Sequence, residues 1–137
     1  MTPTTAADED AAAIRGFIQE NANRVAQWLS GLSDLSDIEW FRGRFVDDLV
    51  MANHRLPQFT VDSGTFDEVM TSYHGLFRDN PVTAAVEFHR IDQLAVDVFL
   101  AIHVQHLNGA AGRSSHVETT VISRSEGGRL SVYAVAE

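Results

Sequence analysis

The stretch Asp97-Val-Phe-Leu-Ala-Ile-His-Val-Gln-His106 alternates between two kinds of side chain, and this period of two predicts a β-strand. One face of the strand is wholly apolar and consists of Val98, Leu100, Ile102 and Val104. The other face is mixed and consists of Asp97, Phe99, Ala101, His103 and Gln105. An ordinary half-exposed strand has one apolar and one hydrated face. The mixed face of this strand therefore predicts a role other than simple exposure to water.

Around this strand, the pattern changes from helical to strand periodicity at Pro81. Before Pro81, we predict three helices, of which the first covers residues 11–29. The second follows a capping box at 36–39 and has Ile38, Phe41 and Phe45 on its apolar side. The third follows a second capping box at 65–68. Short strands are expected at 49–53 and 58–61. After Pro81, we predict strands at 82–91, 94–107, 113–124 and 129–136, with hairpin turns at 108–109 and 126–128. Helices followed by an antiparallel meander indicate an α+β fold.

Composition limits the classes of function. The chain has 137 residues and 45% apolar residues, which indicates one domain over residues 11–137 behind a disordered acidic tail at 1–10. It has no cysteine, which excludes disulfides and thiol catalysis and is typical of a cytoplasmic protein. The net charge of −9 argues against nucleic acid as a partner. No apolar run approaches the ~18 residues of a membrane span, so we expect no membrane association.

A sheet covered by helices on one side leaves its other face uncovered. Here the uncovered face is apolar, and we expect it to form a homodimer, or alternatively to contact helices within the monomer. Its members are Val98, Leu100, Ile102, Val104, Val117, Val121, Leu130 and Val132.

Three segments carry a resemblance to a known family. They are Phe45-Val-Asp-Asp-Leu-Val-Met51, Asp62-Ser-Gly-Thr-Phe66 and the final hairpin, Thr119-Thr-Val-Ile-Ser-Arg-Ser-Glu-Gly-Gly-Arg-Leu-Ser-Val132. In this order they resemble the nuclear-transport-factor-2-like (NTF-2-like) superfamily, which includes SnoaL-like cyclases and ketosteroid isomerases, from about Ala11 to Glu137. The resemblance implies a cone-shaped, curved antiparallel or mixed sheet with three helices from the N-terminal half over its concave face. It also implies a pocket between sheet and helices and a homodimer across the convex face, but no single reaction.

The resemblance to ketosteroid isomerases is informative through the residues that differ. Their general-base aspartate falls at Asn53, and an amide cannot accept a proton in catalysis. Their oxyanion-binding aspartic acid falls at Thr120, which retains only a hydroxyl donor. We therefore do not expect ketosteroid isomerase activity.

The same resemblance turns the mixed face inward, together with His116, Glu118, Thr120 and Ile122 of the next strand and Tyr133 and Val135 of the last. If the hairpin closes around residues 107–112, His103 lies opposite residues 116–118. A neighbouring carboxylate would fix the tautomer of His103 and raise its pKa, so His103 and Glu118 are candidate catalytic residues. The alternative interpretation is a buried histidine that is simply hydrogen-bonded.

The remaining candidates are ligand-binding residues around a mostly apolar pocket whose walls include Phe17, Phe66 and Val135. They are Trp40, Asn53, His54, Tyr73, Asp97, Phe99, His116, Thr120 and Tyr133. Trp40 and Tyr73 could instead be core residues, and His54 could be exposed in a loop. A metal site formed by His103, His116 and Glu118 is conceivable, but no metal-binding spacing occurs and we expect neither metal nor cofactor.

Three functions remain open. The first is a SnoaL-like protein that binds a small apolar or aromatic molecule. The second is a cofactor-free isomerase, dehydratase or cyclase that uses His103 as its acid–base group. The third is a non-catalytic dimerisation module.

Overall fold

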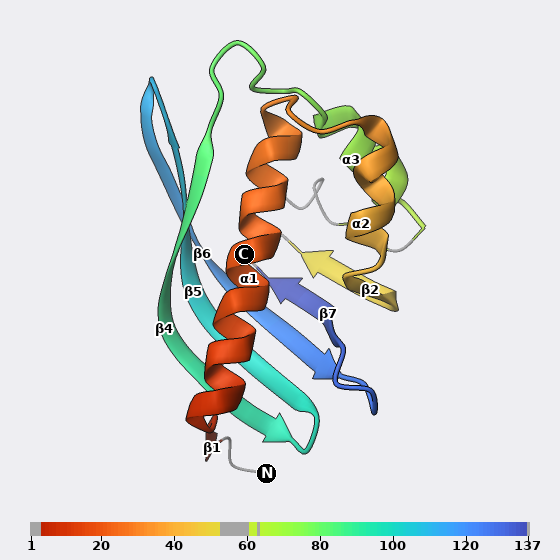
Figure 1. Ribbon diagram of the computed structural model, residues 1–137, viewed down its shortest axis with the longest axis vertical. Coiled ribbons are helices and arrows are strands. Elements are labelled where there is room, and N and C mark those ends of the chain that lie inside the picture. Colours follow the sequence, from red (N-terminus) through yellow and green to blue (C-terminus); the bar gives the residue numbers. More distant parts are fainter. Residues whose placement is uncertain (1–3, 53–60, 63, 137) are drawn as a thin grey trace.

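The computed structural model describes residues 4–52, 61–62 and 64–136, and it describes only the backbone of residues 46–50 and 52. One sheet in the order β1-β4-β5-β6-β7-β2-β3 curves around the long helix α1, while α2 and α3 lie at one end of it (Figure 1). Neighbouring strands are antiparallel except β2 and β7, which are parallel. The predicted α+β class and cone-shaped, mixed sheet are confirmed.

The helices are α1 (Asp8–Leu29), a 3-10 turn η1 (Leu35–Asp37), α2 (Ile38–Arg42) and α3 (Phe66–Tyr73). The first three strands are β1 (Thr4–Thr5), β2 (Phe45–Ala52) and β3 (Val61–Asp62). The last four are the long strands β4 (Thr83–Ala95), β5 (Val98–Gly109) and β6 (Gly112–Arg124) and the shorter β7 (Leu130–Ala136). Within the described residues, no helix is both long and apolar enough to cross a membrane.

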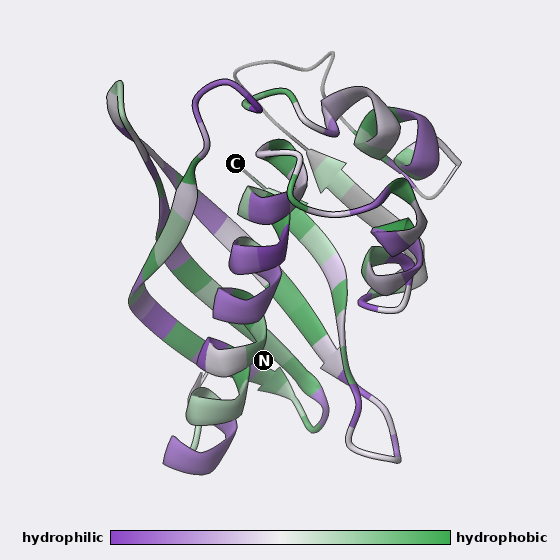
Figure 2. Ribbon diagram, turned by 45° about the horizontal axis from the view of Figure 1, so that its top comes forward, coloured by the Kyte–Doolittle hydropathy of each residue, from purple (hydrophilic) through white to green (hydrophobic). Residues whose placement is uncertain are grey.

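Helix α1 covers the concave face of the sheet because its apolar residues recur at helical spacing. Its buried stripe includes Ile14, Phe17, Ile18, Ala22 and Trp28. Figure 2 shows the resulting alternation of hydrophobic and hydrophilic residues along the helix and the long strands. Gln19 adds a polar anchor, because its side-chain amide accepts from the amide of Val86 at 3.2 Å and donates to the carbonyl of Ala84 at 3.5 Å.

The N-terminal segment differs from the disordered acidic tail predicted over residues 1–10. Thr4 and Thr5 pair with β4, and α1 begins at Asp8 rather than at residue 11. The acidic residues of the tail occupy the first turn of the helix, where the helix dipole favours negative charge. Asp10 also accepts a hydrogen bond from Arg124 at 2.6 Å.

Several predicted boundaries were wrong. Helix α2 ends at Arg42, so Phe45 begins β2 instead of continuing the helical stripe. The capping box belongs to Asp34 and Asp37 rather than to residues 36–39. Thr65 precedes α3 without a side-chain cap, so the second capping box is not formed. Of the expected strands at 49–53 and 58–61, residues 53–60 lie outside the described part of the chain.

The hairpins also close at other residues than predicted. β4 continues through residues 92–93 to Ala95, and the turn to β5 lies at residues 96–97. The turn between β5 and β6 lies at residues 110–111, between the paired Gly109 and Gly112, rather than at 108–109.

A β-bulge in β7 changes which of its residues face inward. Val121 pairs with Ala134 but Ile122 pairs with Val132, so Tyr133 is the extra residue. The bulge breaks the period of two, leaving Tyr133 53% exposed and Val132 only 3% exposed. The structure thus corrects two expectations: Tyr133 does not face the interior, and Val132 belongs to the core instead of the convex face. Leu130 also packs against the core.

Candidate functional site

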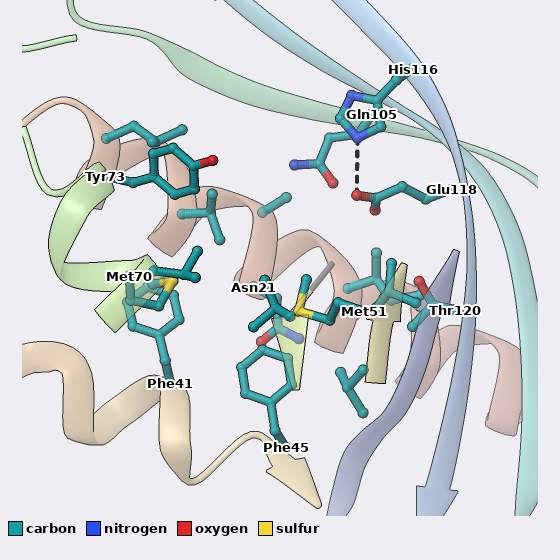
Figure 3. Close-up of a pocket in the computed structure, with 18 of the residues that line it drawn as sticks. Asn21, Phe41, Phe45, Met51, Met70, Tyr73, Gln105, His116, Glu118 and Thr120 are labelled. Carbon is teal, nitrogen blue, oxygen red and sulfur yellow. Dashed lines mark hydrogen bonds and ion pairs between the residues drawn. The ribbon is translucent and has the colours of Figure 1, made fainter. Parts of the chain in front are cut away.

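A cavity of about 420 Å³ lies between the concave face of the sheet and the three helices (Figure 3). Its size is within the range of small-molecule sites. Most of its lining is apolar, with Phe41, Phe45, Met51, Phe66 and Met70 among the contributing side chains. Methionine and aromatic side chains pair large contact area with adaptable shape, which suits a ring-shaped occupant.

Polar side chains concentrate on one wall of this cavity, formed by the neighbouring strands β5 and β6. The strand register places His103 opposite Glu118 and Gln105 opposite His116. All four line the cavity, and so does Thr120. The burial of β5 alternates strictly, with odd residues from Phe99 to Gln105 buried and even residues half-buried. The predicted inward face of β5 is therefore confirmed from Phe99 to Gln105 but not for Asp97, which is exposed, and the predicted register of His103 is confirmed.

Glu118 lies between two histidines on this wall. Its Oε1 is 2.9 Å from Nε2 of His116, and its Oε2 is 3.6 Å from Nε2 of His103. Figure 3 shows the bond between Glu118 and His116 facing the interior of the cavity. The side chain of Glu118 is 13% exposed and that of His116 is 33% exposed. These two groups are therefore more accessible to an occupant than the side chain of His103, which is 1% exposed.

The side chain of His103 is buried more deeply than its predicted role as a catalytic acid–base group would lead us to expect. Its side chain is 1% exposed, and its Nε2 lies 3.0 Å from Oγ1 of Thr120. Its Nδ1 is buried and is without a hydrogen-bond partner in the described part of the chain. Burial lowers the pKa of His103 below its usual value, and the opposing attraction of Glu118 only partly offsets this. The predicted upward shift of this pKa was wrong, because desolvation outweighs the carboxylate.

The other candidate residues separate into those that line the cavity and those that do not. Tyr73, His116 and Thr120 line it. Phe99 is 1% exposed within the core, and Phe17 is also a core residue; neither contributes to the lining. Asn53 and His54 lie outside the described residues.

Three more candidates have other roles. The ring of Trp40 lies under the guanidinium groups of Arg24 and Arg44, at 4.7 and 4.6 Å. Asp97 is exposed in the β4–β5 turn and pairs with Arg124 at 3.1 Å. Tyr133 projects away from the cavity because of the bulge in β7.

Sequence reasoning missed Asn21 as a lining residue. The signal was present, because Asn21 lies three residues after Ile18 and four before Val25 on the apolar stripe of α1. A polar residue inside such a stripe faces the interior. No group of three or more potential metal-ligating side chains occurs within the described ranges.

Comparison with known proteins identifies the fold. No family model matches the chain, and no curated protein matches it. An NTF-2-like protein of unknown function from Pseudomonas aeruginosa superimposes with a TM-score of 0.72 and 25% identity, covering 90% of this chain and 95% of that one.

Two further solved structures share the fold at lower identity. A ketosteroid isomerase-like protein from Erwinia carotovora atroseptica has a TM-score of 0.55 and 16% identity, covering 85% of this chain and 89% of that one. A Catenulispora acidiphila protein in complex with S-DNPA has a TM-score of 0.57 and 16% identity, covering 91% and 93%. This chain, with its helices on the concave face of a curved α+β sheet, belongs to the NTF-2-like superfamily.

Proposed function

We propose that this protein binds a small apolar or aromatic molecule in the cavity between its sheet and its helices. The observation that carries the proposal is the combination of a mostly apolar lining with one polar wall, formed by His103, Gln105, His116, Glu118 and Thr120. An apolar lining supplies affinity through burial, at about 25 cal/mol per Å² of apolar surface removed from water. The polar wall would orient the bound molecule. The ligand-bound Catenulispora neighbour supports this use of the fold.

Filling the cavity tests the proposal. Ala22 on α1 lines the cavity and is 3% exposed, so phenylalanine at this position places a ring where the ligand would lie. We expect Ala22→Phe to weaken binding of 2-acetonaphthone, measured by isothermal titration calorimetry, at least about tenfold, or ~1.4 kcal/mol. The matched control is Ala13→Phe, because Ala13 is exposed on the same helix.

Equal affinity in the wild type and Ala22→Phe would place the binding elsewhere. Saturable binding by the control variant together with loss in Ala22→Phe would locate the ligand in the cavity. Circular dichroism of both variants shows whether the fold is retained.

Acid–base catalysis is the second candidate function. The position of Glu118 between His103 and His116 favours it. We assign the proton-transferring role to Glu118 and His116 rather than to His103, because the first two are the more exposed groups. His103 would then act from behind Glu118 as a positioning residue. The calorimetry sample answers this question as well, since chromatography coupled to mass spectrometry of the recovered ligand separates a converted molecule, including an isomer of equal mass, from one returned unchanged.

The homodimer across the convex face is a further part of the proposal. Val98, Leu100, Ile102 and Val104 are half-buried, and Val117 beside Val104 is 57% exposed. We expect sedimentation equilibrium to give twice the monomer mass for the wild type. Val117→Glu should give the monomer mass, because a carboxylate in an apolar interface is costly to desolvate. Ser36→Glu, at an exposed position in η1, is the control. A dimer that survives Val117→Glu would contradict this interface.

A further inference from the structure

The side chain of Asn21 is a polar group on the helical side of the cavity, opposite the polar wall of β5 and β6. It comes from the middle of α1 and is half-buried. Figure 3 shows Asn21 coming from α1, with Phe45 and Met51 among the other lining residues, whereas Gln105 and Glu118 lie on the strand side. An amide in such apolar surroundings is costly unless its hydrogen bonds are made.

Arg44 fixes the orientation of this amide. Nε of Arg44 donates a hydrogen bond of 2.9 Å to Oδ1 of Asn21. A guanidinium group has donors only, so the oxygen of Asn21 must face Arg44 and the amide nitrogen must face the other way. The usual ambiguity between the oxygen and nitrogen of an asparagine is therefore removed by chemistry.

Arg44 is itself held in place from several sides. Its guanidinium carbon lies 4.2 Å from the ring centre of Phe17 and 4.6 Å from that of Trp40. Its Nη2 pairs with Glu20 at 3.0 Å. Its backbone carbonyl accepts from the amide of Val132 at 2.7 Å, which ties the α2–β2 connection to β7. The orientation of Asn21 thus rests on a rigid group rather than on a mobile surface side chain.

The amide nitrogen of Asn21 has no hydrogen-bond partner among the described residues, although Oδ1 is bonded. Its two N–H groups therefore remain donors at the wall of a largely apolar cavity. A cation bonded to the amide oxygen also polarises the amide and strengthens its N–H groups as donors.

We propose that Asn21 is a specificity-determining residue that donates a hydrogen bond to a carbonyl oxygen of the ligand. The proposal rests on the ligand-binding function proposed above and narrows its ligand class to apolar ring compounds that carry a carbonyl group. The carbonyl oxygen accepts from Nδ2 of Asn21, while the ring lies against the aromatic and methionine side chains. Arg44 positions the amide without touching the ligand.

The experiment compares the binding of two probes to the wild type and to two variants of Asn21. 2-Acetonaphthone and 2-ethylnaphthalene share one skeleton, and only the first carries the carbonyl oxygen. Asn21→Asp keeps the size of the side chain and an oxygen for Arg44, but replaces the N–H donors with an acceptor. Asn21→Leu, which removes both polar atoms, guards against an effect of the new charge.

We expect the ratio of the two dissociation constants to favour the ketone about tenfold more in the wild type than in either variant, which is ~1.4 kcal/mol of coupling. The ¹³C resonance of a labelled carbonyl should also shift on binding to the wild type and lose most of that shift in Asn21→Asp. Both probes binding with an unchanged ratio would overturn the role of Asn21 and leave the binding function standing. Failure of both probes to bind the wild type would overturn the binding function and this inference together.

Discussion

Replacing Trp28 with alanine is expected to lower the free energy of unfolding by about 3–5 kcal/mol, measured by urea denaturation. The indole is 1% exposed and its ring meets Phe41 edge-on at 5.5 Å and His74 at 4.6 Å. Its Nε1 donates a hydrogen bond of 2.7 Å to the carbonyl of Met70. That carbonyl lies in the last turn of α3, where helices leave carbonyls unsatisfied. One side chain of α1 therefore joins both α2 and α3 to α1.

Trp28→Phe separates the two contributions. It keeps most of the ring contact but leaves the carbonyl of Met70 without its donor, and we expect a loss of about 1–3 kcal/mol. A loss below 1 kcal/mol in Trp28→Ala would contradict the role of Trp28 as the link between the helices.

Acidification is expected to destabilise the protein through His103. Because the folded-state pKa of His103 is lowered, the unfolded chain binds the proton more tightly than the folded one. The stability is fully present above the unfolded pKa of about 6.5 and is lost as the pH falls from there through the folded pKa. The slope in that window reaches about 1.4 kcal/mol per pH unit. Urea denaturation at a series of pH values measures it.

His103→Gln tests this assignment, because glutamine keeps a polar side chain beside Thr120 and Glu118 but does not titrate. We expect the variant to lose less stability than the wild type between neutral and mildly acidic pH. His89→Gln, which replaces an exposed histidine of β4, serves as the control and should follow the wild type. If His103→Gln and the wild type lost stability in parallel as the pH falls, His103 would be excluded as the cause.

Periodicity was sufficient to predict the parts of the site that lie on regular strands. The alternation from Val98 to Gln105 predicts the inward face of β5, and the hairpin places His103 opposite Glu118. These inferences need only the pleat of a strand and the length of a turn. They are local, so one sequence contains the necessary information.

The errors arose where tertiary structure overrides local pattern. The bulge in β7 depends on how β6 and β7 pair, and one extra residue moved Tyr133 out of the cavity and Val132 into the core. Phe45 continues a helical stripe in the sequence but pairs with Val132 of β7 in the sheet. The pKa of His103 depends on how completely its ring is enclosed, which a neighbouring carboxylate does not reveal.

The position of β7 also determines when the sheet can be completed during synthesis. β2 emerges early, yet its partner on one side is the last strand of the sheet, with more than half of the chain between them. Contacts this distant in sequence close late and slow folding. Strand β2 can therefore join the sheet only after residues 130–136 have been made. The cavity, which is lined by Met51 of β2 and Val135 of β7, closes on that side only at this late stage.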